Sequence, residues 1–143
     1  MKVGIPRALF YYYYYPLWLS FFKSLGVEVV LSPVTSKATV NEGLKLAVDE
    51  ACLPIKVFYG HTAQLVEQVD WLFLPRIVSV SPKEYICPKF MGLPDMIREN
   101  FEKLPSLISP IIDRSKNPEK AYQAALEVGL HFTKNKHKIA EAW

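Results

Sequence analysis

The sequence predicts an α/β domain in which a small parallel sheet is covered by helices on both faces. Short apolar runs of strand length alternate along the chain with longer segments whose apolar residues recur at helical spacing. Proline or glycine stands at many of the boundaries between them and ends regular structure there. This alternation is typical of doubly wound folds, because each parallel strand needs a crossover connection to reach the next.

Four apolar runs are predicted to form the sheet. Each is short and apolar, and a proline lies at or near its end. The runs are residues 2–5, 27–31, 71–74 and 107–112. Residues 77–80 are expected to continue the third run in extended form.

Five segments between and after these runs are predicted to be helices. They are an aromatic segment up to Phe22 that stops at Gly26, residues 40–49, residues 53–69, residues 93–103, and a long helix from Asn117 towards Trp143. Capping residues at 35–37 precede the second helix, and Asn117 with Pro118 suits the start of the last one. Residues 81–94 are expected to form a loop at a strand end, where α/β folds carry chemistry.

The composition indicates one soluble globular domain over residues 1–143. Half of the residues are apolar and 22% are charged. No apolar run reaches the roughly 20 residues that span a bilayer, and no signal peptide is recognisable, so we expect a cytoplasmic protein that does not enter a membrane. The net charge of +3 is mild and mostly scattered, which gives no support to nucleic-acid binding.

Two cysteines, Cys52 and Cys87, are the main candidates for chemistry. Each stands beside a proline at a predicted helix start, where unpaired N–H groups and the helix dipole favour thiolate over thiol. Lys56 and Lys89 are expected to add positive charge nearby. The ends of adjacent parallel strands are expected to bring the two cysteines to one crevice, as an iron–sulfur or redox site. A buried core cysteine and a disulfide are the alternatives.

Three long segments resemble one known family. They are VGIPRALFYYYYYPLW at residues 3–18, VDEACLPIKVFYGH at residues 48–61, and FLPRIVSVSPKEYICPKFMGLPDMIR at residues 73–98. Together and in this order they resemble the activase-related group of the 2-hydroxyacyl-CoA dehydratase superfamily. That superfamily also includes benzoyl-CoA reductase-like and double-cubane cluster proteins.

The resemblance implies a cytoplasmic iron–sulfur protein with a fold similar to flavodoxin-like α/β domains. In this superfamily, cysteine thiolates hold [4Fe–4S] or double-cubane clusters. An ATP-hydrolysing activator injects one electron, and the reduced cluster acts on a 2-hydroxyacyl-CoA thioester. By motif, Cys52 and Cys87 match the cluster ligands of the family.

The chain departs from the family in its number of cysteines. Dehydratase-type subunits use three cysteines per cluster, whereas this chain has two. The missing ligand is expected downstream of Trp143 in a longer polypeptide, or from a second chain at a symmetric interface with four thiolates. The chain is therefore expected to be the N-terminal part of a longer family member or one protomer of an oligomer, and to hold only an incomplete cluster alone.

Two arginines are further candidates for cofactor binding. Arg7 follows the first strand and Arg76 follows the third at the equivalent position. A guanidinium there could bind an acyl-CoA carboxylate, a phosphate or the negative charge of a reduced cluster. The alternative for each is a structural salt bridge. Glu50 could pair with either arginine or accept a proton, or it could be a solvated helix end.

His61 and the tyrosines at residues 11–15 have less specific roles. His61 could be a fourth ligand or a proton donor, although a single histidine is more often a satisfied polar residue. Successive helical residues lie about 100° apart, so some of the tyrosines are expected in the core and others facing the loop crevice or a partner. A tyrosine hydroxyl near a cluster could tune it by hydrogen bonding.

The predicted function is low-potential electron transfer, or radical dehydration or reduction of acyl-CoA-type substrates. Whether the chain is itself catalytic is left open, as part of a dehydratase-like lyase or of an ATP-dependent reductase system. No dinucleotide, Walker or serine-hydrolase motif is present, so ATP hydrolysis is expected in a partner. The alternatives are an interaction domain without a cluster and a redox protein that uses the two thiols directly.

Overall fold

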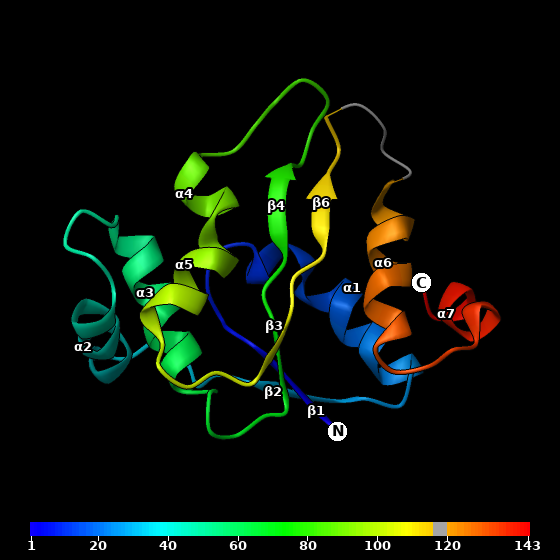
Figure 1. Cartoon of the computed structure of the whole chain (residues 1–143), viewed down its shortest axis with the longest axis horizontal. Helices are drawn as coiled ribbons and strands as arrows, with labels where there is room; N and C mark the ends of the chain where they lie inside the picture. Colours follow the sequence, from blue (N-terminus) through cyan, green and yellow to red (C-terminus); the bar gives the residue numbers. More distant parts are fainter. Residues whose placement is uncertain (116–119) are drawn as a thin grey trace.

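The computed structural model describes residues 1–115 and 120–143, and it has three layers (Figure 1). The strands are β1 (Lys2–Ile5), β2 (Glu28–Leu31), β3 (Trp71–Phe73), β4 (Arg76–Ser79), β5 (Ser106–Ile108) and β6 (Ile111–Asp113). The helices are α1 (Tyr11–Ser24), α2 (Lys37–Leu46), α3 (Leu53–Ala63), α4 (Pro88–Met91), α5 (Leu93–Asn100), α6 (Lys120–Leu130) and α7 (Lys136–Ala142). The predicted capping residues Asn117 and Pro118 lie outside the described residues.

The main sheet is parallel and has the strand order β2-β1-β3-β5. β1 lies in the middle, with Val3 opposite Val29 on one side and Trp71 on the other. The chain adds β2 on one side of β1 and then crosses to add β3 on the other. The α/β prediction is confirmed, and this order is that of a flavodoxin-like three-layer fold.

Prolines interrupt the two strands on the β3 side of the sheet. Pro75 separates β3 from β4, and Pro110 separates β5 from β6, because proline has no N–H group for the ladder. The pairing resumes at once, since the Arg76 N–H donates to the Pro110 carbonyl oxygen at 2.9 Å. β4 and β6 then form a short parallel pair of their own beyond the main sheet (Figure 1). The predicted extension of the third strand is confirmed, and the predicted fourth strand is divided in two.

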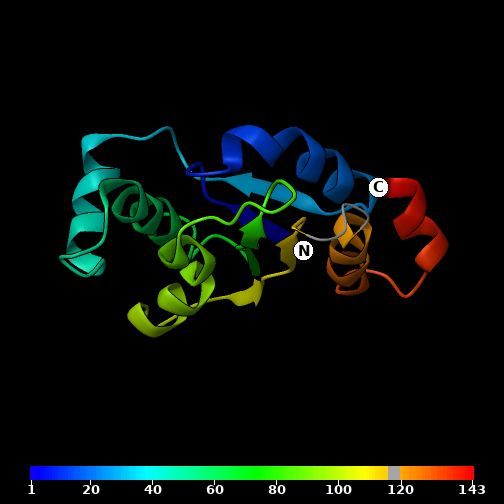
Figure 2. The same cartoon turned by 90° about the horizontal axis from the view of Figure 1, so that it is seen from above.

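Both faces of the sheet are buried, each under its own helices. On one face Val3, Ile5 and Phe73 pack with residues of α1, α6 and α7. On the other face Leu72 and Leu74 pack with residues of α3 and α5. Figure 2 shows these two groups of helices on opposite sides of the strands. Burial of a large apolar side chain contributes about 1.5–3 kcal/mol to the free energy of folding. Because successive side chains of a strand point to opposite faces, the strands stabilise the helix layers on both sides of the sheet.

Several predicted helices differ from the observed ones. The segment at 40–49 is displaced, since α2 runs from Lys37 to Leu46, and the segment at 93–103 is helical only to Asn100. The segment at 53–69 is helical only to Ala63 and continues as turns. The prediction of one long final helix is wrong, because this part of the chain forms two separate helices, α6 and α7. Asn135 caps α7 by accepting hydrogen bonds from the His137 and Lys138 N–H groups. The first helix ends at Ser24, just before the predicted stop at Gly26, whose φ of +80° favours glycine.

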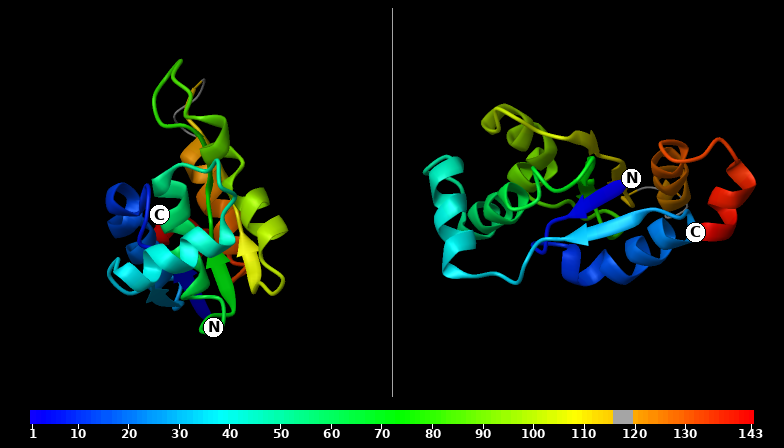
Figure 3. Two further views of the ribbon diagram at one scale, coloured as in Figure 1. Left: turned by 90° about the vertical axis from the view of Figure 1, so that its left-hand side faces the viewer. Right: turned by 90° about the horizontal axis from the view of Figure 1, so that it is seen from below.

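Helices α2 and α3 pack side by side through glycines (Figure 3). A Cβ on Gly43 would overlap the Lys56 carbonyl oxygen, and a Cβ on Gly60 would overlap the Thr39 carbonyl oxygen. The absence of side chains at these two positions therefore lets the two backbones touch. This contact fixes α3, the helix that begins beside Cys52.

The variant Gly60→Ala is expected to lower the free energy of unfolding by about 1–3 kcal/mol, because overpacking forces the backbones of α2 and α3 apart. Urea denaturation measures the change. Gly92→Ala is the control, since its Cβ would lie 3.4 Å from its nearest neighbour, the Pro88 carbonyl oxygen. Equal stability losses in the two variants would contradict the close-packing argument.

Candidate functional site

Both cysteines lie at helix N-termini, as expected at the junctions beside their prolines, but residues 88–91 form α4 within the stretch 81–94 that was expected to be a loop. Cys52 is the N-cap of α3 and Cys87 is the N-cap of α4, and each is followed by a proline within the first two helical positions. Both thiols are free, and both residues are exposed. The alternative of a buried core cysteine is therefore wrong, and no disulfide joins the two residues in this structure.

One hydrogen bond joins the two segments that carry the cysteines. Lys89 Nζ donates to the Glu50 carbonyl oxygen at 2.7 Å. Cys52 lies two residues after Glu50, and Cys87 lies two residues before Lys89. The starts of α3 and α4 are thus held beside each other, although they are distant in the sequence.

A second lysine braces the segment that precedes Cys52. Lys56 Nζ donates to the Asp49 carbonyl oxygen at 2.9 Å. Both predicted lysines therefore place their ammonium groups on the loop before α3. Within the described residues Glu50 forms no ion pair with Arg7 or Arg76, and its backbone carbonyl is the group that makes a contact.

The two thiols do not make a complete metal site by themselves. In residues 1–115 and 120–143, no group of three or more His, Cys, Asp or Glu side chains is arranged to hold a metal ion. An iron–sulfur cluster is commonly held by four cysteine thiolates. The chain has two cysteines, fewer than the four thiolates of such a site.

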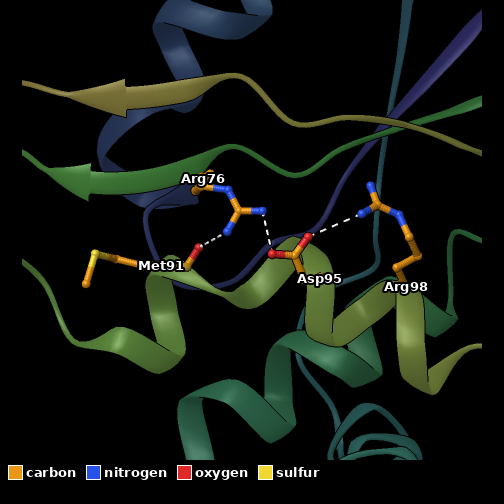
Figure 4. A network of polar contacts seen from close by, with 4 residues as sticks. All are labelled: Arg76, Met91, Asp95 and Arg98. Carbon is orange, nitrogen blue, oxygen red and sulfur yellow. Dashed lines mark hydrogen bonds and ion pairs between the residues drawn. The ribbon is translucent and has the colours of Figure 1, made fainter.

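Arg76 makes structural contacts that hold α4 and α5 against β4 (Figure 4). Its Nη1 donates to the Met91 carbonyl oxygen at 2.9 Å, and its Nη2 donates to Asp95 Oδ2 at 2.6 Å. The other oxygen of Asp95 accepts from Arg98 at 3.2 Å. Arg76 therefore forms a structural salt bridge, which was the alternative to a role in cofactor binding. Because Met91 ends α4, this network positions the helix that begins beside Cys87.

The crevice between the ends of β1 and β3 is filled by aromatic side chains. Ligands of doubly wound folds bind at such a switch point, yet here Phe10 and Phe90 meet edge to face with ring centroids 4.9 Å apart. The free volume is about 50 Å³, little more than the space of a water molecule or two. Cys52 and Cys87 do not line this crevice. Helices α3 and α4, and not the strand ends, bring the two cysteine segments together.

Arg7 is half-buried in the loop after β1 and differs from Arg76 in its surroundings. Its backbone N–H donates to Ser32 Oγ at 2.8 Å. Its Nε is buried and has no hydrogen-bond partner within the described residues. Its side chain lines a second groove together with tyrosines of α1. The tyrosines divide as expected, since Tyr12 and Tyr13 are exposed and the other three are half-buried.

Residues 2–143 match the family described as the CoA enzyme activase uncharacterised domain. The chain belongs to this family. This match confirms the predicted relation to activase-related proteins. The domain is therefore related to activators of acyl-CoA enzymes. No match was found among curated proteins or among solved structures. Within the described ranges, none of the helices has the length and apolar character needed to cross a bilayer.

The activase domain also contains a buried polar network that the sequence did not reveal. The imidazole of His61 is fully buried, with Nδ1 2.8 Å from Ser32 Oγ and Nε2 2.8 Å from Thr35 Oγ1. Both ring nitrogens are engaged, so His61 is a satisfied polar residue and not a fourth metal ligand. Burial, and then the charge of Arg7, lower the pKa of His61 below its usual range. The neutral ring fixes the loop after β2 against α3.

The free energy of unfolding is expected to fall as the pH is lowered through the ordinary histidine range, about 6.5. In the unfolded chain His61 takes up a proton there, whereas its lowered pKa keeps it neutral in the fold, so acid favours the unfolded state. Urea denaturation at a series of pH values measures the slope, and His61→Gln should flatten it.

The control for this titration is His137→Gln, because the His137 side chain is 81% exposed. This variant should keep the slope of the unmodified domain. An unchanged slope in His61→Gln would show that the buried network does not cause the pH dependence.

Proposed function

We propose that this domain supplies Cys52 and Cys87 as ligands to an iron–sulfur cluster in a system that activates an acyl-CoA enzyme of the 2-hydroxyacyl-CoA dehydratase type. The observation that supports this most is the position of two exposed, free thiols at the starts of α3 and α4. The Lys89 to Glu50 hydrogen bond holds the two segments together. Membership of the activase family supplies the biological setting.

The donor set fits one half of a cluster site. Thiolates are the soft ligands that iron–sulfur clusters require, and both thiols are exposed. The other ligands would come from a second copy of this chain or from another part of the system. When bound, such a cluster would carry the low-potential electron that the acyl-CoA enzyme needs.

The other residues around the cysteines have supporting roles in this proposal. Lys56 and Lys89 brace the backbone before Cys52 and bring positive charge to it. Arg76 acts by positioning, because its contacts with Met91 and Asp95 fix α4 and leave its guanidinium occupied. Arg7 keeps its guanidinium free of any ion pair within the described residues and could face an anion. ATP hydrolysis belongs to a partner component in this scheme.

Anaerobic reconstitution with iron and sulfide is the direct test. The domain should take up iron and acid-labile sulfide, show a charge-transfer absorption that dithionite bleaches, and elute at twice the mass of the chain if two copies share the cluster. Cys52→Ser and Cys87→Ser should each remove most of the iron while the far-ultraviolet circular dichroism stays unchanged, because exposed N-cap residues contribute little to the core.

A matched control is His61→Gln, which alters a potential ligand type whose nitrogens are already engaged. It should retain the iron of the unmodified domain. Absence of iron after reconstitution, or full iron in either serine variant, would contradict the ligand assignment. An iron-free protein whose two thiols form a reversible disulfide would instead support thiol-based redox chemistry.

A further inference from the structure

A groove beside Arg7 lies apart from the two cysteines and has a free volume of about 370 Å³. It is formed by the loop after β1, the first two turns of α1 and the loop after β2. The lining residues are Arg7, Tyr11, Tyr12, Tyr15, Pro16 and Val34. A water molecule occupies about 30 Å³ in the liquid, so the groove has room for roughly a dozen groups of that size.

The groove contains a positive charge that the described residues do not neutralise. No acidic side chain lines it, and Arg7 forms no ion pair in residues 1–115 and 120–143. Its buried Nε has no hydrogen-bond partner there. A guanidinium charge without a counterion, held partly away from water, costs free energy, and an anion in the groove would offset this cost by pairing with the accessible part of the group. Arg76, at the equivalent place after β3, has Asp95 as its counterion and presents no such free charge.

The tyrosines supply flat apolar walls and hydroxyl donors next to this charge. The rings of Tyr11 and Tyr15 have centroids 4.7 Å apart, and those of Tyr11 and Tyr12 are 5.0 Å apart. None of the three hydroxyls has a hydrogen-bond partner within the described part of the chain. Burial raises the pKa of Tyr11, and the charge of Arg7 opposes this only in part. The Tyr11 phenol therefore stays protonated and can donate.

We infer that this groove binds a small organic anion, with its phosphate or carboxylate group on the Arg7 guanidinium and a flat apolar portion against the tyrosine rings. A guanidinium presents paired N–H donors that match both anionic groups. Aromatic rings prefer a flat partner in an offset or edge-to-face arrangement. The size of the groove favours such a molecule over a bare inorganic ion. The inference does not depend on a cluster or on either cysteine.

Isothermal titration calorimetry with phenyl phosphate and benzoate tests the assignment. The titrated protein is the full chain carrying Cys52→Ser and Cys87→Ser, so that metal uptake cannot affect the result. At least one probe should bind with a Kd of about 1 mM or tighter. It should bind more tightly than inorganic phosphate or phenol, which each carry half of its features. The tighter of the two probes identifies the anionic group.

Two pairs of variants locate the bound probe. Arg7→Met should weaken binding about tenfold or more, because it removes the charged hydrogen bonds, while Arg98→Met removes a more exposed arginine and should not change it. Tyr12→Ala should weaken binding, whereas its neighbour Tyr13→Ala, which is outside the groove lining, should not. Tyr12 is 70% exposed, so this pair remains informative if Arg7→Met fails to fold. Absence of binding by both probes, or equal binding by the members of each pair, would overturn the inference.

Discussion

The rest of this structure depends on the burial of both faces of four parallel strands. β1 has neighbours on either side and side chains packed above and below it, so its position and register are fixed by four surfaces at once. Parallel strands place their carboxyl ends at one edge of the sheet. Arg7 and Arg76 therefore come to that edge as a result of core packing and not of any contact of their own.

The two arginines follow neighbouring strands, β1 and β3, but have different surroundings. Arg76 is bound on two sides by groups of α4 and α5, and the result is a fixed helix start. Within residues 1–115 and 120–143, Arg7 has only its backbone N–H engaged, by Ser32, and its side chain lies beside the tyrosines. The presence of a counterion therefore distinguishes the two side chains: Arg76 has Asp95 beside it, and Arg7 has no acidic partner within the described residues.

The sequence predicted the elements whose signals are local. Apolar runs closed by prolines identified the first three strands, and a proline next to each cysteine identified the two helix starts. The split of the final helix was missed because it depends on the contact between Gly129 and Ile139 across the hairpin, while a capping asparagine such as Asn135 has no distinctive neighbours in the sequence. The network around His61 was missed for a similar reason, since its partners belong to another loop.

The paired prolines after β3 and β5 give the sheet a step. Below the step four strands lie edge to edge, and above it only β4 and β6 continue, so β1 and β2 end at a lower level (Figure 1). Aromatic side chains of the loop after β1 and of α4 fill the space beyond the ends of β1 and β3. Arg7 lies beside the ends of β1 and β2, where its backbone N–H donates to Ser32 Oγ. Two residues that cannot donate a hydrogen bond thus mark the point where four paired strands give way to two.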